Sequence, residues 1–153
     1  MENEAFLIFT SDQALTLEAV LNSLIPAEGE MPGAGDLGIA SFVDKALTDA
    51  PHLRRHILGV LDQLAIDCWR DHQQSFPTLP QSEKVALLQR REQEQGESFG
   101  TLVHATYAGY YSHPGVVEAL GAKVPSESES HLRPFDPQLL DNVRRRGPVY
   151  KDI

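Results

Sequence analysis

Apolar residues recur every three or four positions along much of this chain, and this spacing constrains its fold more than any other feature. The clearest case begins at Pro51 and continues to about Gln74. There the apolar positions form one stripe along a helix, and they are Leu53, Ile57, Val60, Leu61, Leu64, Ala65, Cys68 and Trp69. We therefore predict a long helix over residues 51–74, with proline in its first turn and with Cys68 and Trp69 buried on its inner face.

Segments rich in proline and glycine divide the rest of the chain into further helices. Pro26–Gly35 is predicted to be a loop, FPTLP at residues 76–80 is a second break, and Gly96 is expected to end a helix. The predicted helices span residues 12–24, 37–48, 51–74, 81–95, 98–111 and 114–120. Sustained alternation of the kind that marks strands is lacking. The sequence therefore predicts an all-α fold, a single-domain bundle of about five to six helices over residues 1–121.

The composition changes after Gly121. The stretch VPSESES is polar and has few apolar residues, as is typical of an extended linker. Asp136 and Pro137 are then expected to start a short helix that ends before Gly147 and Pro148. We predict that residues 122–153 form an extended tail with a short terminal helix.

The charge and the cysteine content exclude several classes of protein. A formal net charge of -9 at pH 7 would repel the phosphates of nucleic acid and of anionic membranes. Cys68 is the only cysteine, so no intrachain disulfide points to an oxidising compartment. The apolar run Ala5–Phe9 is too short to span a bilayer, and no basic or twin-arginine signal precedes it. We expect a cytoplasmic protein without nucleic-acid partners and without membrane insertion.

Two short motifs match ligand-binding patterns in their letters alone. GAGDLG at residues 33–38 has the glycine spacing of a dinucleotide-binding loop, but the PAEGEMP segment before it cannot form the strand that such a loop requires. His52 and His56 have the spacing of a zinc-binding pair, but two arginines separate them and no third ligand is evident. Glu-x-x-His, which di-iron helical bundles use, does not occur. We therefore assign no catalytic, cofactor-binding or metal-binding residue to this chain.

The segment HATYAGYYSHPG, residues 104–115, concentrates aromatic and histidine side chains. On a helix His104, Tyr107 and Tyr111 share one stripe, and Tyr110 lies on the neighbouring one. Tyrosine combines an apolar ring with a polar hydroxyl, which suits a surface that is partly buried and partly wet. Three interpretations stay open: a core helix, a protein–protein surface, or a catalytic group with His104, Tyr110 and His113 as acid–base residues.

Four segments occur in an order that is typical of one protein family. They are LNSLIPAEGEMPGAGDLGIASFVDKAL, FPTLPQSEKVALLQ, HATYAGYYSHPGV and FDPQLLDNVRRRGPVY, and together they extend from about residue 17 to residue 150. The first combines an Ile-Pro helix end, a Pro/Gly-rich acidic loop and a helix that carries Phe-x-Asp. In this order the chain resembles the gluconate 2-dehydrogenase subunit 3 family.

The resemblance implies a small, helical, non-catalytic subunit. Such subunits accompany a large flavoprotein of the glucose–methanol–choline type, which oxidises sugars, sugar acids or alcohols with FAD. The cofactor would belong to that partner, and this chain would stabilise it or help it mature. The residues expected to face the partner are Tyr107, Tyr110, Tyr111, His113, Phe135, Arg145 and Tyr150.

The chain departs from the family pattern in two places. Many members begin with a twin-arginine signal, which this sequence does not have, and many carry Gly-Gly-Asn where this chain has Gly115–Glu118. Two other classes of function remain as alternatives, a stand-alone helical enzyme and a generic helical binding module.

The interpretation of GAGDLG can be tested with nucleotides. A ligand that binds only the native state must stabilise it, by about 2.7 kcal/mol at a hundredfold excess over its dissociation constant. We expect saturating NAD, NADP or FAD to leave the melting temperature unchanged in a thermal-shift measurement. A reproducible rise of several degrees would reverse our assignment of this loop.

Overall fold

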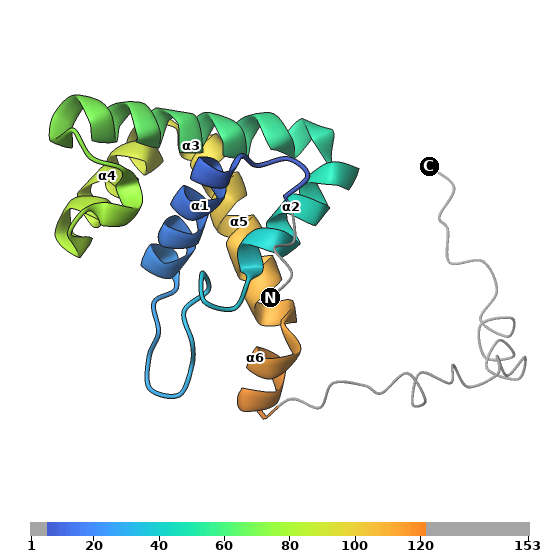
Figure 1. Ribbon diagram of the computed structural model, residues 1–153. Coiled ribbons are helices and arrows are strands. Elements are labelled where there is room, and N and C mark those ends of the chain that lie inside the picture. Colours follow the sequence, from blue (N-terminus) through green and yellow to red (C-terminus); the bar gives the residue numbers. More distant parts are fainter. Residues whose placement is uncertain (1–5, 122–153) are drawn as a thin grey trace, which may run out of the picture. The chain divides into compact units, whose positions relative to one another are not determined.

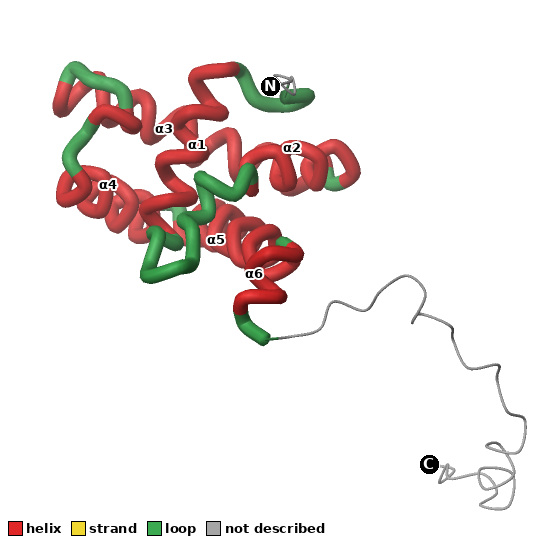
Figure 2. The backbone as a smooth tube through the Cα atoms, turned by 60° about the horizontal axis from the view of Figure 1, so that its bottom comes forward, coloured by secondary structure: helices red, strands yellow, loops and turns green. Residues whose placement is uncertain are grey.

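The computed structural model describes residues 6–121, and all of these belong to one compact unit. This part consists of α1 (Ser11–Leu24), α2 (Ile39–Asp49), α3 (Pro51–His72), the 3-10 turn η1 (Phe76–Thr78), α4 (Gln81–Glu94), α5 (Gly96–Ser112) and α6 (Pro114–Ala119). Figure 2 shows these helices joined by loops, without a strand in the described part.

The predicted all-α class is confirmed. Every predicted helix is present, although Gly96 begins α5 rather than ending α4. The predicted tail lies outside the described residues.

Helix α5 is the central element of the bundle. It contacts α1, α2, α3, α4 and α6, and Figure 1 shows it extending from α3 to α6. Its approach to α2 is close, because a Cβ atom on Gly109 would lie 2.7 Å from side-chain atoms of both Ile39 and Phe42. A residue with a side chain could occupy this position only if Ile39 and Phe42 shifted.

The core is formed by the inner faces of α1–α5. Its fully buried apolar side chains include Leu17, Leu21, Val43, Ile57, Leu61, Leu64, Cys68 and Leu102. The predicted burial of Cys68 is thus confirmed. Burial raises the pKa of the Cys68 thiol to about 11, and the nearby carboxylates of Asp67 and Asp71 add to this shift. The thiol is therefore protonated at neutral pH and behaves as a small apolar side chain.

The predicted burial of Trp69 is wrong, because its side chain is 62% exposed. The residues of α3 that face the core follow the spacing Ile57, Leu61, Leu64 and Cys68. Successive residues of an α-helix are rotated by about 100°, so Trp69 points away from the direction of Cys68. It lies beside the buried stripe, not on it.

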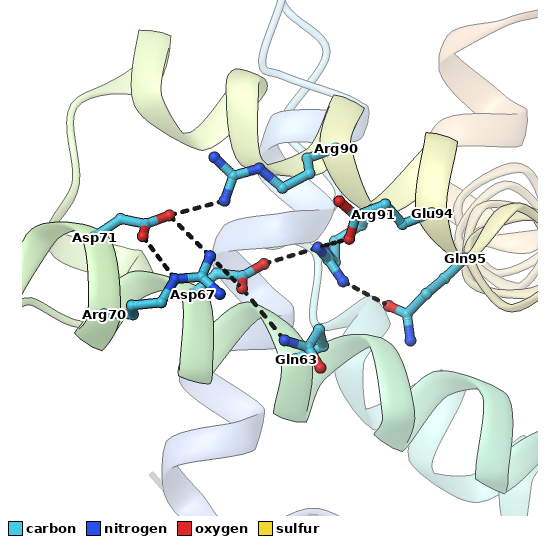
Figure 3. Close-up of polar contacts among 8 residues, drawn as sticks. All are labelled: Gln63, Asp67, Arg70, Asp71, Arg90, Arg91, Glu94 and Gln95. Atoms are coloured by element: carbon cyan, nitrogen blue, oxygen red, sulfur yellow. Dashed lines mark hydrogen bonds and ion pairs between the residues drawn. The ribbon is translucent and has the colours of Figure 1, made fainter.

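Charged side chains join α3 to α4 inside the bundle, as Figure 3 shows. The buried Asp67 carboxylate lies 3.0 Å from the buried Arg91 guanidinium. Its other oxygen is 3.0 Å from the Arg70 guanidinium and accepts a 3.2 Å hydrogen bond from Gln63. A buried charge without such partners would be strongly destabilising. The Asp67–Arg91 pair therefore sets where α4 packs on α3.

The same network continues to the surface at Asp71. Its carboxylate accepts hydrogen bonds from Arg70 and Arg90, each at 2.8 Å. These two guanidinium groups hold the pKa of Asp71 well below its usual range. Since Arg90 belongs to α4 and Asp71 to α3, this exposed pair links the same two helices a second time.

A second buried carboxylate holds the segment before α1. Asp44 on α2 accepts backbone hydrogen bonds from Leu7, Ile8 and Phe9, at 2.7, 2.9 and 3.1 Å. These three N–H groups belong to consecutive residues outside any helix, so they need an acceptor of this kind. Asp44 is the acidic residue of the Phe-x-Asp pattern, and the structure gives it this role.

The loop between α1 and α2 is packed against α1. Asn22 accepts a 2.8 Å hydrogen bond from the Gly35 backbone N–H and donates one to Asp36 at 3.1 Å. A Cβ atom on Gly35 would lie 2.3 Å from the carbonyl oxygen of Glu18, and one on Gly33 would lie 2.3 Å from the Asn22 side chain. Gly33 and Gly35 are thus required for contact with α1, whereas Gly38 is exposed and has a positive φ of 69°. The faces of Gly33 and Gly35 are covered, whereas a dinucleotide-binding loop must leave its glycines open to pyrophosphate.

We expect Gly35→Ala to destabilise the protein by about 1–3 kcal/mol, because the new methyl group would meet a helix carbonyl that cannot rotate away. Gly100→Ala is the matched control, since the Cβ position of Gly100 is open and exposed on α5. It should be neutral or stabilise by up to about 1 kcal/mol, because alanine favours the helix. Urea unfolding of both variants measures this difference. Equal stabilities would contradict the close packing of the loop on α1.

Candidate functional site

The C-terminal half of α5 presents an aromatic surface. Tyr107 and Tyr111 are 44% and 52% exposed, and their rings are stacked with centroids 6.0 Å apart and planes 5° apart. His104 is exposed on the same helix stripe. We call His104, Tyr107 and Tyr111 the tyrosine stripe. Stacking holds the two rings in a defined position before any partner arrives, which lowers the entropy lost on binding.

Tyr110, which the sequence groups with the partner-facing residues, instead lies in the core. Its side chain is 3% exposed, and its hydroxyl donates a 3.0 Å hydrogen bond to the carbonyl oxygen of Pro32. Its ring packs edge-on against Tyr111, with centroids 5.3 Å apart. Tyr110 thus anchors the loop before α2 and supports the exposed Tyr111 from below. Of the two neighbouring stripes of α5, the one that contains Tyr110 is therefore buried, and the one that contains Tyr107 and Tyr111 is exposed.

His113 connects α5 to α6. Its Nδ1 atom accepts a 3.2 Å hydrogen bond from the backbone N–H of Gly115, so the side chain caps α6. The remaining residues expected to face the partner, Phe135, Arg145 and Tyr150, lie outside the described residues. Of the predicted set, Tyr107 and Tyr111 are the two that the structure brings together on an exposed surface.

The structure does not assemble His104, Tyr110 and His113 into an acid–base site. The hydroxyl of Tyr110 is directed to Pro32 and the imidazole of His113 to Gly115, while His104 lies on the exposed stripe. A general base must reach the proton that it removes. Tyr110 is buried and bonded to one segment, His113 caps another, and His104 is exposed, so the three groups share no site.

The two histidines at the start of α3 have no shared site. His56 Nδ1 lies 2.9 Å from the Ser98 hydroxyl on α5, so this side chain contributes to helix packing. Over residues 6–121, no three His, Cys, Asp or Glu side chains come together in a group that could hold a metal ion. None of the helices in the same range is both long and apolar enough to cross a bilayer.

Sequence reasoning missed a second exposed apolar surface. Trp69 borders a groove of about 280 Å³ between α1, α3 and η1. We call this the Trp69 groove, and it is lined by Asp12, Leu15, Ala65, Trp69, Phe76 and Pro77. Leu15 on α1 is itself exposed, and so is Ile66, which follows Ala65 on α3. Periodicity alone did not set Leu15 and Trp69 apart, because both are apolar. The packing shows that both fall outside the phase of the buried residues on their helices.

A comparison with protein families identifies the group to which these features belong. The family model for gluconate 2-dehydrogenase subunit 3 matches residues 11–123. The chain belongs to the gluconate 2-dehydrogenase subunit 3 family. No individual curated protein and no solved structure matches it.

The family match covers all the described helices from α1 to α6. In this subunit 3 chain the GAGDLG loop, the Phe-x-Asp pattern and the tyrosine stripe therefore all lie within the residues that the family model matches. The C-terminal segment FDPQLLDNVRRRGPVY, which also resembles some family members, falls after the matched residues.

The assignment of the two stripes predicts opposite behaviour for two tyrosines. Tyr110→Phe should destabilise the protein by about 0.5–1.5 kcal/mol, because the Pro32 carbonyl loses its buried donor. Tyr107→Phe, the control, removes an exposed hydroxyl and should change stability by less than about 0.5 kcal/mol. The free energies of unfolding in urea measure both effects. If Tyr110→Phe unfolds like the parent, the hydrogen bond to Pro32 does not stabilise the loop.

Proposed function

We propose that this chain is the non-catalytic small subunit of an FAD-dependent dehydrogenase or oxidase that acts on sugars, sugar acids or alcohols. It binds a large flavoprotein subunit of the glucose–methanol–choline type, and it stabilises that subunit or helps it mature. FAD and the reacting groups belong to the large subunit. Membership of the gluconate 2-dehydrogenase subunit 3 family supports this proposal, because the family is named as subunit 3 of a dehydrogenase.

The observation that carries the proposal is the exposed, stacked pair Tyr107 and Tyr111. Protein–protein interfaces are enriched in tyrosine, and their binding energy is concentrated in a few such side chains. A stacked pair on a packed helix presents a large apolar area at low entropic cost. The buried Tyr110 beneath it keeps Tyr111 in place. The stripe thus has the properties of a preformed docking surface.

Binding to the large subunit tests this proposal directly. We would co-express the chain with the flavoprotein that is encoded nearest to it and measure the dissociation constant of the purified pair. The double variant Tyr107→Ala/Tyr111→Ala should bind at least about tenfold more weakly, as expected for interface hot spots. Its melting temperature should stay close to that of the parent, since both side chains are exposed.

Val85→Ala on α4 is the matched control, because Val85 is an exposed apolar residue outside the tyrosine stripe. It should bind the flavoprotein like the parent. Failure of the parent chain to bind the flavoprotein would reject the proposed function. Binding that is unaffected by the double variant would reject the tyrosine stripe as the docking surface.

A further inference from the structure

The Trp69 groove exposes large apolar side chains that a solvent-facing surface seldom gathers in one place. Trp69, the only tryptophan of the chain, is 62% exposed at its edge. Leu15, which is 56% exposed on α1, also lines the groove. Clustered exposure of this kind marks interaction surfaces, and tryptophan is the residue most enriched at binding hot spots. The groove is concave, so it can receive a side chain rather than only a flat surface.

The charge around the groove defines what can bind there. Residues 1–44 contain no Lys, Arg or His, so the only charged side chains of α1 are acidic, and these are Asp12 and Glu18. Asp12 lines the groove itself. Asp62 on α3 is joined to α1 through a 3.0 Å hydrogen bond from Gln13. The nearby Arg70 and Arg90 of α3 and α4 are engaged by Asp71. Lys84 lies over the Phe76 ring, 6.0 Å from its centroid, so the negative charge comes from the α1 side of the groove, where Asp12 favours a cationic group.

We propose that the Trp69 groove is a second docking site for the large flavoprotein subunit, and that it takes an extended basic segment of that subunit. A bulky apolar side chain of the segment enters the groove against Trp69, Phe76 and Pro77. A lysine or arginine beside it pairs with Asp12. This inference rests on the proposed function, but it uses a different surface from the tyrosine stripe. The groove is lined on α3 by Ala65 and Trp69, near the C-terminal end of that helix, whereas the stripe lies in the C-terminal half of α5.

Because Trp69 is the only tryptophan, it reports directly on the groove. We would label the chain with 5-fluorotryptophan and mix it with the unlabelled flavoprotein subunit. The single fluorine resonance should shift or broaden on complex formation. Trp69→Ala should weaken the complex at least about tenfold, and Asp12→Asn should weaken it less while reducing its dependence on salt concentration. Leu7→Ala, which truncates an exposed side chain away from the groove, should bind like the parent.

Each result separates the second docking site from its alternatives. If the complex forms but the fluorine resonance and the affinity of Trp69→Ala stay unchanged, the groove is not a docking site, and the proposed function still stands. If the resonance shifts with the concentration of this chain alone, a second copy covers the groove and the proposal is overturned. If Trp69→Ala weakens binding but Asp12→Asn leaves the salt dependence unchanged, the basic character of the segment is rejected. If the parent chain forms no complex with the flavoprotein, the proposed function itself is rejected, and the second docking site with it.

Discussion

The close approach of α5 to α2 at Gly109 is the constraint on which the rest of the bundle depends. Without a side chain at this position, the backbone of α5 can lie against Ile39 and Phe42. The neighbouring Thr106 is fully buried and satisfies its hydroxyl on the Leu102 carbonyl oxygen, so it also allows close packing. This placement decides the orientation of every later residue of α5. Tyr110 consequently reaches the loop before α2, and Tyr107 and Tyr111 face solvent.

Buried polar side chains position the elements that surround α5. Asp44 holds the segment before α1, Asn22 holds the glycine loop, and the Asp67–Arg91 pair joins α3 to α4. Hydrophobic burial is non-directional and would tolerate small shifts of each element. Hydrogen bonds and paired charges require defined geometry, and a buried polar group that loses its partner is costly. These contacts therefore select one arrangement among several that would bury the same apolar area.

The same packing leaves two aromatic surfaces unburied, the tyrosine stripe and the Trp69 groove. Their chemistry differs, because the stripe presents two stacked hydroxyl-bearing rings and the groove combines an indole with a carboxylate. The polar groups of Tyr110 and His113 are meanwhile used for internal contacts. Polar groups used inside the core make the bundle rigid, and exposed aromatic side chains are typical of binding surfaces. A large subunit that engaged both surfaces would be held at two sites on this chain.

The sequence by itself determined the all-α class, the approximate bounds of the six helices and the separation of Tyr107 and Tyr111 from Tyr110 on α5. Proline, glycine and a three-to-four-residue apolar spacing act within one helix, so they can be read without the rest of the fold.

Only the tertiary structure decided which tyrosine stripe is buried, why Trp69 is exposed, and what the glycines of GAGDLG contact. Periodicity shows which residues share one side of a helix. How many side chains beside that apolar stripe are also buried depends on how many neighbouring helices pack around it. Asp44 and Asp67 each have a partner on another segment, 37 and 24 residues away at Leu7 and Arg91, and no pattern within one helix predicts such a partner. Long-range contacts of this kind exist only once the helices have packed.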